Sequence, residues 1–217
     1  MQALDSFTNK AYSKRYGRSK DVCKPKLQNA YTIGVYVKCG SKRVLLASLS
    51  GQKGADSEIF QIYDMAPVLD PENIDKVGYI NTLVFNPVFD YKYVLSPTDR
   101  AVVNLFLKFI TNQLYAKLLE CFTSDRVKAI YLITISKVLD FLSASGIVFE
   151  RVPGVHLLQN EYTNYIFNSF QKYWQPELAK NTPQVLSFKG VRESMVQQNG
   201  EGRLEYDKET GQLWICS

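Results

Sequence analysis

The stretch IYLITISKVLDFLSASGIVFERVPG, residues 130–154, decides the predicted fold. The apolar run 129–135 predicts a strand, the amphipathic segment 137–144 predicts a short helix, and 147–152 predicts a second strand. Gly146 stands where the end of a helix favours a residue that tolerates left-handed backbone conformation. A strand, a helix and a strand in such close succession are typical of a mixed α/β domain.

Antiparallel strands are predicted for the first part of the chain. Runs rich in apolar residues, bounded by turn residues, predict strands over 31–39, 42–50, 57–64 and 76–85. Gly40 and Ser41 form the expected tight turn between the first two strands, and Asn86-Pro87 ends the fourth.

The strongest local signal is the start of a helix at Ser96-Pro97-Thr98-Asp99. Ser96 can cap the first turn, Pro97 suits the first helical position, and Asp99 can reach back as in a capping box. Helical spacing continues through Val102, Leu105, Phe106, Phe109 and Ile110. We therefore expect a long, well-buried helix through about residue 120.

The remaining elements complete an α/β sandwich. An apolar side chain recurs about every four residues over 157–174, which predicts a helix, and 203–216 predicts a hairpin. We expect a mixed, mostly antiparallel twisted sheet with flanking helices and a C-terminal helix plus hairpin. The whole chain, 1–217, is predicted to be one domain, with a basic N-terminal arm over 1–28 and a C-terminal extension over 155–217. The glycine-rich motifs of nucleotide-binding loops do not occur.

The net charge of +5 is concentrated at the front of the chain. Residues 1–43 hold ten lysines and arginines against two aspartates, so the remainder is slightly acidic. A basic front can contact nucleic acid, an anionic membrane or an acidic carrier protein, or it can be an ordinary solvated surface.

Composition also narrows the chemistry. The four cysteines are far apart and Met1 is not followed by the apolar core of a signal peptide, so we expect a cytoplasmic protein with free thiols. Polar residues interrupt the apolar segment 101–119, and a membrane span is not expected. His156 is the only histidine, which excludes a histidine-rich metal site. No metal and no permanently bound cofactor are expected.

The predicted order of elements resembles the acyl-CoA-dependent N-acyltransferase (GNAT) fold. In that fold the fourth and fifth strands splay apart, a thioester arm lies between them, and its phosphates meet the start of the following helix. The resemblance makes 76–85 the fourth strand, 129–135 the fifth, and the helix start at Ser96 an anion site. Residues 92–101 lack the glycines of the usual coenzyme A loop.

Acyl-homoserine-lactone synthases share this fold without relying on that loop. Their pattern S/A-G-W-x-x-x-R-x-G is similar to Ser145–Gly154, with Ile147 in place of the tryptophan and one inserted residue. The common LuxI-type signature Glu-x-Ser-Arg is not present on the fourth strand, where only Thr82 matches the hydroxyl position. Length, tyrosine-rich composition and layout resemble the second group of these enzymes, the LuxM/AinS type.

This resemblance implies acylation of the amine of S-adenosylmethionine by acyl-CoA or an acyl carrier protein. The methionyl carboxylate then closes a lactone and releases methylthioadenosine. The enzyme must hold a sulfonium, accept a proton and stabilise an oxyanion. Asp56, Glu58 and Asp64 suit the first two tasks, and on one strand Glu58 and Asp64 would share a face. The alternative for Asp56 and Glu58 is a solvated loop.

The other expected site residues follow from the same layout. Backbone N–H groups near Phe85–Asn86 are the expected oxyanion donors, with Thr82 and Asn81 adding side-chain polarity or simply bonding within the sheet. The catalytic residues are thus predicted to be Glu58, Asp64 and Thr82. The predicted substrate-binding residues are Arg15, Tyr16, Arg18, Asp56, Asn81, Phe85, Lys92, Arg100, Thr134 and Ser136.

Each group of binding residues has an expected role and a plainer alternative. Lys92 and Arg100 would bind the thioester phosphate, although Arg100 can instead pair with Asp99 or Glu120. Thr134 and Ser136 would touch the acyl chain, although Ser136 can be a helix cap. The arm residues Arg15, Tyr16 and Arg18 would cover the adenosyl substrate or dock an acidic acyl carrier protein.

Two other functions remain open from the sequence. One is an N-acyltransferase of the same fold that acts on a different amine, and methylthioadenosine release separates it from the synthase. The other is a basic nucleic-acid-binding protein, which predicts tight, salt-sensitive binding. It ranks lower, since the positive charge lies in the front arm and not along the aromatic strands.

Overall fold

A computed structural model describes residues 30–39, 42–86, 89, 96–134, 136–164, 184–192, 203–207 and 212–216. The strands are β1 (Ala30–Cys39), β2 (Lys42–Lys53), β3 (Tyr63–Asp64), β4 (Val77–Phe85), β5 (Ala129–Thr134), β6 (Ile147–Arg151), β7 (His156–Leu157), β8 (Gln184–Val191), β9 (Arg203–Asp207) and β10 (Gln212–Cys216). The helices are α2 (Ile59–Ile62), the 3-10 helix η2 (Pro71–Lys76), α3 (Pro97–Ser124) and α4 (Ser136–Ala144).

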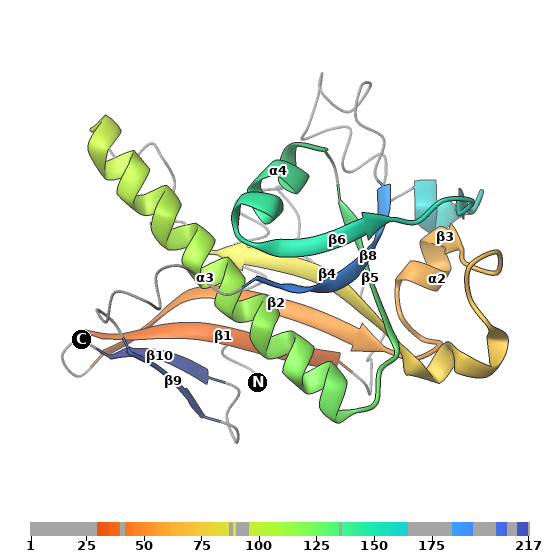
Figure 1. The fold of residues 1–217 in the computed structure, drawn as a ribbon, viewed down its shortest axis with the longest axis horizontal. Coiled ribbons are helices and arrows are strands. Elements are labelled where there is room, and N and C mark those ends of the chain that lie inside the picture. Colours follow the sequence, from red (N-terminus) through yellow and green to blue (C-terminus); the bar gives the residue numbers. More distant parts are fainter. Residues whose placement is uncertain are drawn as a thin grey trace.

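Eight of these strands form one twisted sheet, drawn in Figure 1, with the order β6-β8-β5-β4-β2-β1-β10-β9. The pairs β4–β5 and β1–β10 are parallel, and the other neighbours are antiparallel. The prediction of a mixed, mostly antiparallel sheet with flanking helices is therefore confirmed. A separate two-stranded sheet is formed by β3 and β7.

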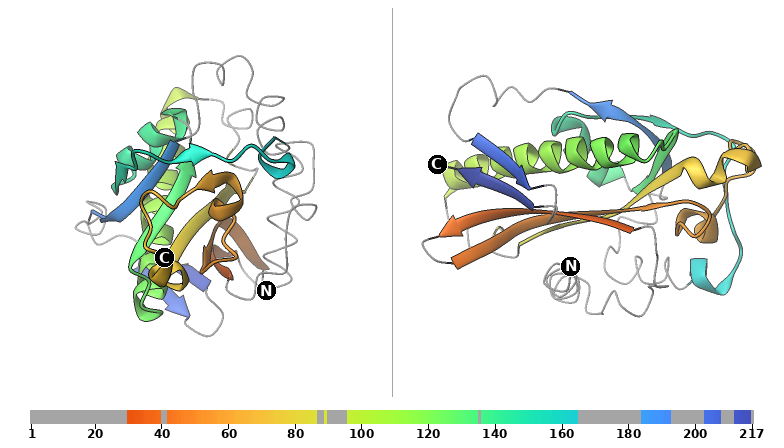
Figure 2. Two further views of the ribbon diagram at one scale, coloured as in Figure 1. Left: turned by 90° about the vertical axis from the view of Figure 1, so that its right-hand side faces the viewer. Right: turned by 90° about the horizontal axis from the view of Figure 1, so that it is seen from below.

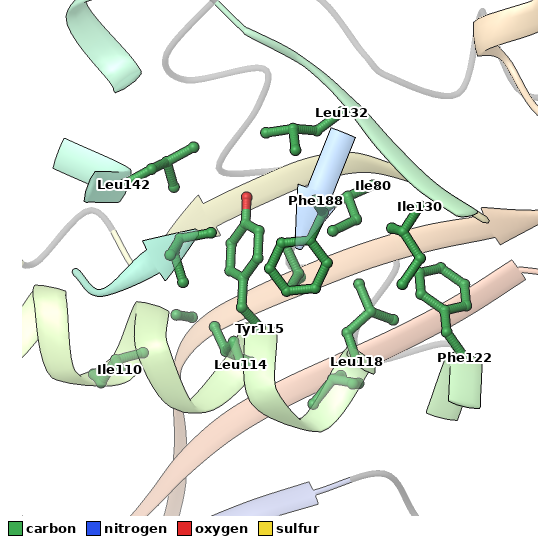
Figure 3. Packing of buried hydrophobic residues seen from close by; sticks show 14 of the residues in the cluster. Ile80, Ile110, Leu114, Tyr115, Leu118, Phe122, Ile130, Leu132, Leu142 and Phe188 are labelled. Atoms are coloured by element: carbon green, nitrogen blue, oxygen red, sulfur yellow. The ribbon is translucent and has the colours of Figure 1, made fainter. Parts of the chain in front are cut away.

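The two faces of the sheet bury separate apolar clusters, because successive side chains of a strand point to opposite faces. On one face, α3 and α4 pack on the sheet, and Figure 3 shows Leu114, Tyr115 and Leu118 of α3 directed toward the strands. On the other face, α2 and β3 pack against Tyr79 of β4 and Tyr131 of β5. The sheet is therefore the middle layer of the described part of the fold.

Helix α3 begins at the predicted place. The hydroxyl of Ser96 accepts a hydrogen bond from the Asp99 N–H (3.0 Å) and donates one to the Asp99 carboxylate (2.6 Å). Burial of the whole helix was overestimated, since Val102 and Leu105 are 63% and 61% exposed. A helix of 28 residues is about 42 Å long. Figure 2 shows α3 running along one face of the sheet.

The decisive stretch folds as predicted. β5, α4 and β6 follow one another with bounds within one residue of those expected. Gly146 ends the helix with a φ of +79°, a conformation that favours glycine. β1, β2, β4 and the hairpin of β9 with β10 are also confirmed.

One predicted strand was wrong, one predicted helix begins later than expected, and one strand was missed. Residues 57–64 are not one strand, because α2 occupies 59–62 and only Tyr63–Asp64 is extended. The helix predicted over 157–174 begins at 161, because residues 156–157 form strand β7; residues 165–174 lie outside the described part of the chain. β8 was missed, although it separates β5 from β6 in the sheet. The α2 error arose because four helical residues are too few to show helical periodicity.

The ring of Phe122 fixes α3 to the sheet at the end where β4 begins. A methyl group at Gly51 would lie 2.8 Å from the ring, and one at Gly78 would lie 3.2 Å from it. Tyr31 packs edge-on against the same ring, with 5.1 Å between centroids. The Tyr31 hydroxyl also hydrogen-bonds to the Asp125 carboxylate, just after α3 ends. Glycine is therefore required on β2 for the helix to approach this closely.

Gly51→Ala should destabilise the protein by about 1–3 kcal/mol, because the fully buried Phe122 has no room to move away from an added methyl group. Urea denaturation of both proteins measures the difference. Phe122→Leu frees space near Gly51, so the double variant should lose less free energy of unfolding than the two single losses combined. Strict additivity would show that this contact does not limit the approach of α3.

Tyr63 makes stability sensitive to alkali. Burial raises the pKa of its hydroxyl to about 12 from an ordinary value of 10. Between these pH values the unfolded chain loses the proton and the folded chain keeps it, so the free energy of unfolding falls as pH rises. Tyr63→Phe removes this titration, and urea denaturation between pH 9 and 12 should give a shallower decline. Equal slopes for both proteins would contradict this assignment.

Candidate functional site

Strands β4 and β5 separate after a short paired segment. Their parallel pairing covers residues 77–80 against 129–132 and ends at Ile80 and Leu132. Figure 1 shows the two strands diverging from this shared start, and β5 is paired with β8 on its other edge. Among the described strands none pairs with residues 81–85 of β4 on the β5 side. We call residues 81–85 the unpaired stretch because no described strand pairs with them on the β5 side, although residues 82–85 pair with β2 on the other side.

Backbone N–H groups of the unpaired stretch point away from β2. The Asn86 N–H donates to the carbonyl of Leu46 in β2 (2.7 Å), so Asn86 is not the oxyanion donor that was expected. Antiparallel neighbours exchange hydrogen bonds at alternate residues, and counting back from Asn86 leaves Leu83 and Phe85 outside the β2 ladder. Their N–H groups therefore face the side on which β5 diverges.

Asn81 opens the unpaired stretch and lies in a β-bulge. Ser50 is paired with Thr82 and Gly51 with Ile80, so Asn81 is an extra residue of β4 without a partner on β2. Its side-chain oxygen Oδ1 is buried and accepts no hydrogen bond. Bulges re-aim side chains and occur often beside active sites.

One face of the sheet carries a row of polar side chains, which we call the polar face: Ser48, Ser50, Gln52 and Thr82. Leu49 and Gly51 contact the α3 side, so alternation places the three β2 residues on the opposite side. Thr82 is the register partner of Ser50 and shares that side. Ser48 and Gln52 are buried at 1% and 6% exposure.

Glu58 is held beside the polar face. Its backbone N–H donates to Oε1 of Gln52 (2.7 Å), and its half-buried carboxylate accepts a hydrogen bond from the Tyr162 hydroxyl (2.6 Å). Ser57, directly before it, is 1% exposed and its hydroxyl has no hydrogen-bond partner. Glu58 and Thr82, both predicted to be catalytic, therefore lie toward the same face of the sheet.

Residues 156–164, which are far from Glu58 in the sequence, position its carboxylate. The Leu158 N–H donates to the carbonyl of Ile62 (2.9 Å), and the Asn160 side chain donates to the carbonyl of Gln61 (3.0 Å). Asn160 also caps the turn that carries Tyr162 by accepting from the Thr163 N–H (2.7 Å). The α2 turn and Tyr162 are thus fixed to one another.

The other predicted carboxylates lie elsewhere. Asp64 is exposed in β3, and its side chain accepts a hydrogen bond from the Ala66 N–H (3.0 Å). Asp56 is exposed in the turn before Ser57. Glu58 and Asp64 do not share a strand face as predicted, because the α2 turn separates them.

Thr134, which was predicted to touch the acyl chain, lies on the opposite face from Glu58, and so does the side chain of Phe85. Thr134 follows Leu132 at strand spacing, so it faces α3, and it is the last residue of β5. Phe85 packs edge-on against Phe141 of α4, with 6.0 Å between ring centroids. Ser136 is the first residue of α4.

The start of α3 has few free donors for a phosphate. The N–H groups of Asp99 and Arg100 already donate to Ser96, and the Asp99 carboxylate adds negative charge there. Arg100 is exposed, and its predicted phosphate contact remains a prediction. The predicted binding residues Lys92, Arg15, Tyr16 and Arg18 lie outside the described residues.

Sequence reasoning missed Gln52, Ser57 and Tyr162. The alternation of Ser48, Ser50 and Gln52 with apolar residues and glycine is a visible signal for a polar strand face. Tyr162 carried no comparable signal, because it fitted the apolar spacing of a predicted helix.

Other features limit the kinds of site in the described part of the chain. No group of three His, Cys, Asp or Glu side chains among those residues is placed to hold a metal ion. Of the helices described, none combines the length and the hydrophobicity that a membrane crossing needs. Cys121 of α3 forms no disulfide bond.

Comparisons with known proteins do not assign the chain to a family. No protein-family model matches it, and neither a curated protein nor a solved structure matches it.

Proposed function

We propose that the protein is a cytoplasmic acyl-homoserine-lactone synthase of the LuxM/AinS type. It acylates the amine of S-adenosylmethionine from acyl-CoA or an acyl carrier protein and then closes the lactone. The observation that carries the proposal is the unpaired stretch of β4, whose outward N–H groups at Leu83 and Phe85 lie beside diverging β5. This divergence is the feature that the resemblance to the N-acyltransferase fold leads one to expect.

The unpaired stretch suits an extended thioester. An arm that contains amides can hydrogen-bond along a strand edge much as an added strand does. A thioester carbonyl beside Leu83 or Phe85 would then receive backbone N–H donors as negative charge develops on its oxygen. Phe85 and Thr134, on the α3 side, are available to contact the acyl chain.

The acceptor amine approaches from the polar face. Glu58 has a partly buried carboxylate that Tyr162 orients, and no described cation forms an ion pair with it. It takes the proton from the ammonium group, or lies against the sulfonium, while Thr82 and Ser50 offer hydroxyl groups on the same face. Substrates on opposite faces of the sheet meet where β4 and β5 separate.

The reaction needs two displacements. The amine nitrogen bonds to the thioester carbonyl carbon, the carbon–sulfur bond breaks, and the thiol leaves with a proton. The methionyl carboxylate oxygen then bonds to the carbon next to the sulfonium, and methylthioadenosine leaves with the electrons of the broken bond. Neither step requires an enzyme nucleophile. Transfer to a different amine would stop after the first step, so methylthioadenosine release distinguishes the two functions.

Expression of the chain in a host that makes no lactones tests the proposal. Mass spectrometry of the medium should detect an N-acyl-homoserine lactone, and its mass gives the acyl chain. Glu58→Ala and Glu58→Gln should reduce its formation by about 10²–10⁴-fold, because the proton acceptor is removed. Glu72→Gln, which removes an exposed carboxylate on η2, is the matched control and should retain activity. No lactone from folded protein given both substrates in vitro would overturn the proposal.

Tyr162→Phe tests whether the orientation of the Glu58 carboxylate matters, because the variant keeps Glu58 and removes only its hydrogen bond from Tyr162. The variant keeps the ring and loses the hydrogen bond to the carboxylate, so kcat should fall by about 10-fold while the thioester KM stays near that of the wild type. Steady-state kinetics with purified protein measures both values. A rise in the thioester KM with unchanged kcat would show that Tyr162 acts on thioester binding instead.

A further inference from the structure

The side-chain oxygen of Asn81 has no described function within the fold. It is buried, it accepts no hydrogen bond, and it belongs to the residue that the bulge leaves without a partner on β2. A buried acceptor without a donor costs stability, so such groups are rare and call for an explanation. An acceptor that the protein itself leaves unbonded suits a ligand that brings an N–H or O–H donor.

The position of Asn81 in β4 limits the kinds of ligand that can contact it. It directly follows Ile80, the last residue of β4 that pairs with β5, and it precedes the outward N–H of Leu83 by two residues. Two residues of extended strand span about 7 Å. One reacting pair can therefore contact both groups, with its acceptor amine at the Asn81 oxygen and its thioester oxygen at the backbone donors.

We propose that Asn81 Oδ1 accepts a hydrogen bond from the primary amine that attacks the thioester. This inference rests on the proposed acyl transfer and assigns the amine-binding atom within it. The hydrogen bond fixes one N–H of the amine, so the nitrogen lone pair is directed toward the thioester carbonyl. Asn81 itself takes up no proton, and that task belongs to Glu58.

A neutral amide suits this position better than a carboxylate. An amide oxygen accepts a hydrogen bond from both the ammonium and the free amine, so it retains the nucleophile after deprotonation. A carboxylate at the same place would stabilise the ammonium form, which has no free lone pair. Asn81→Asp should therefore bind the amine ligand at least as well as the wild type and turn over at least 10-fold more slowly.

The melting temperature distinguishes a ligand-binding role of Asn81 from a structural role. Because the Asn81 oxygen has no partner to lose, Asn81→Leu should leave the melting temperature unchanged or raise it. Asn73→Leu is the matched control, since the Asn73 amide on η2 donates to Asp70 and accepts from Lys128. The control should lose some stability and keep its activity.

Equilibrium titration with two ligands tests the assignment directly. S-adenosylhomocysteine carries the amine, and methylthioadenosine has the adenosine and sulfur without it. Asn81→Leu should weaken binding of the first by about 10-fold to 100-fold and change binding of the second by less than 2-fold. Unchanged affinity for S-adenosylhomocysteine would overturn the assignment, and so would an equal loss for both ligands, which indicates a damaged site.

A parallel assay keeps this inference distinct from the proposed function. If the wild type forms no lactone and releases no methylthioadenosine, the synthase proposal fails. Acylation of simple primary amines from acetyl-CoA is then compared in the wild type and Asn81→Leu. A loss of at least 10-fold in the variant supports Asn81 as the amine-binding residue of another N-acyltransferase. Equal rates, or no acylation by either protein, overturn the assignment.

Discussion

The rest of the fold depends on how closely Phe122 packs against β2 and β4. Its ring fills the space that side chains at Gly51 and Gly78 would occupy, and Tyr31 of β1 packs on its edge. These contacts hold α3 against three strands at the end where β4 and β5 are still paired. β8 pairs with the other edge of β5 over residues 130–134, and β4 and β5 no longer pair beyond Ile80 and Leu132. The first residues of β4 are thus packed under Phe122 and paired with β5, whereas residues 81–85 have no described partner on the β5 side.

In the described part of the chain, two buried side-chain oxygens have no hydrogen-bond partner, and one of them lies where β4 and β5 separate. The orphan oxygen of Asn81 begins the unpaired stretch, and the orphan hydroxyl of Ser57 adjoins Glu58, which bonds to β2. In a structure selected only for stability, such groups would be paired or replaced by apolar residues. Proteins accept this kind of local cost where a substrate supplies the missing partner, so the two orphans and the proposed site support each other.

The fold was largely predictable because its long elements carry strong local signals, and the site was less so. β1, β2, β4, α3 and the segment 129–151 were found from periodicity, caps and glycine. α2 and β7 are too short for periodicity to show. β8 was overlooked, although Asn181-Thr182-Pro183 stands directly before it as a turn signal. Glu58 could be predicted as a site residue from its charge alone. Tyr162 could not be, because 104 residues separate it from Glu58 and only tertiary packing joins them.

A site built on strand backbone also explains why the sequence shows no sharp motif. The proposed oxyanion donors are the N–H groups of Leu83 and Phe85, and backbone donors place few demands on the side chains that accompany them. What the sequence must encode instead is geometry: a bulge at Asn81, glycines that admit Phe122, and the pairing of β5 with β8. These requirements are spread over residues 51–188 and do not form a short pattern. Asn81 is the exception, since its side chain, position and lack of a partner can all be tested by one substitution.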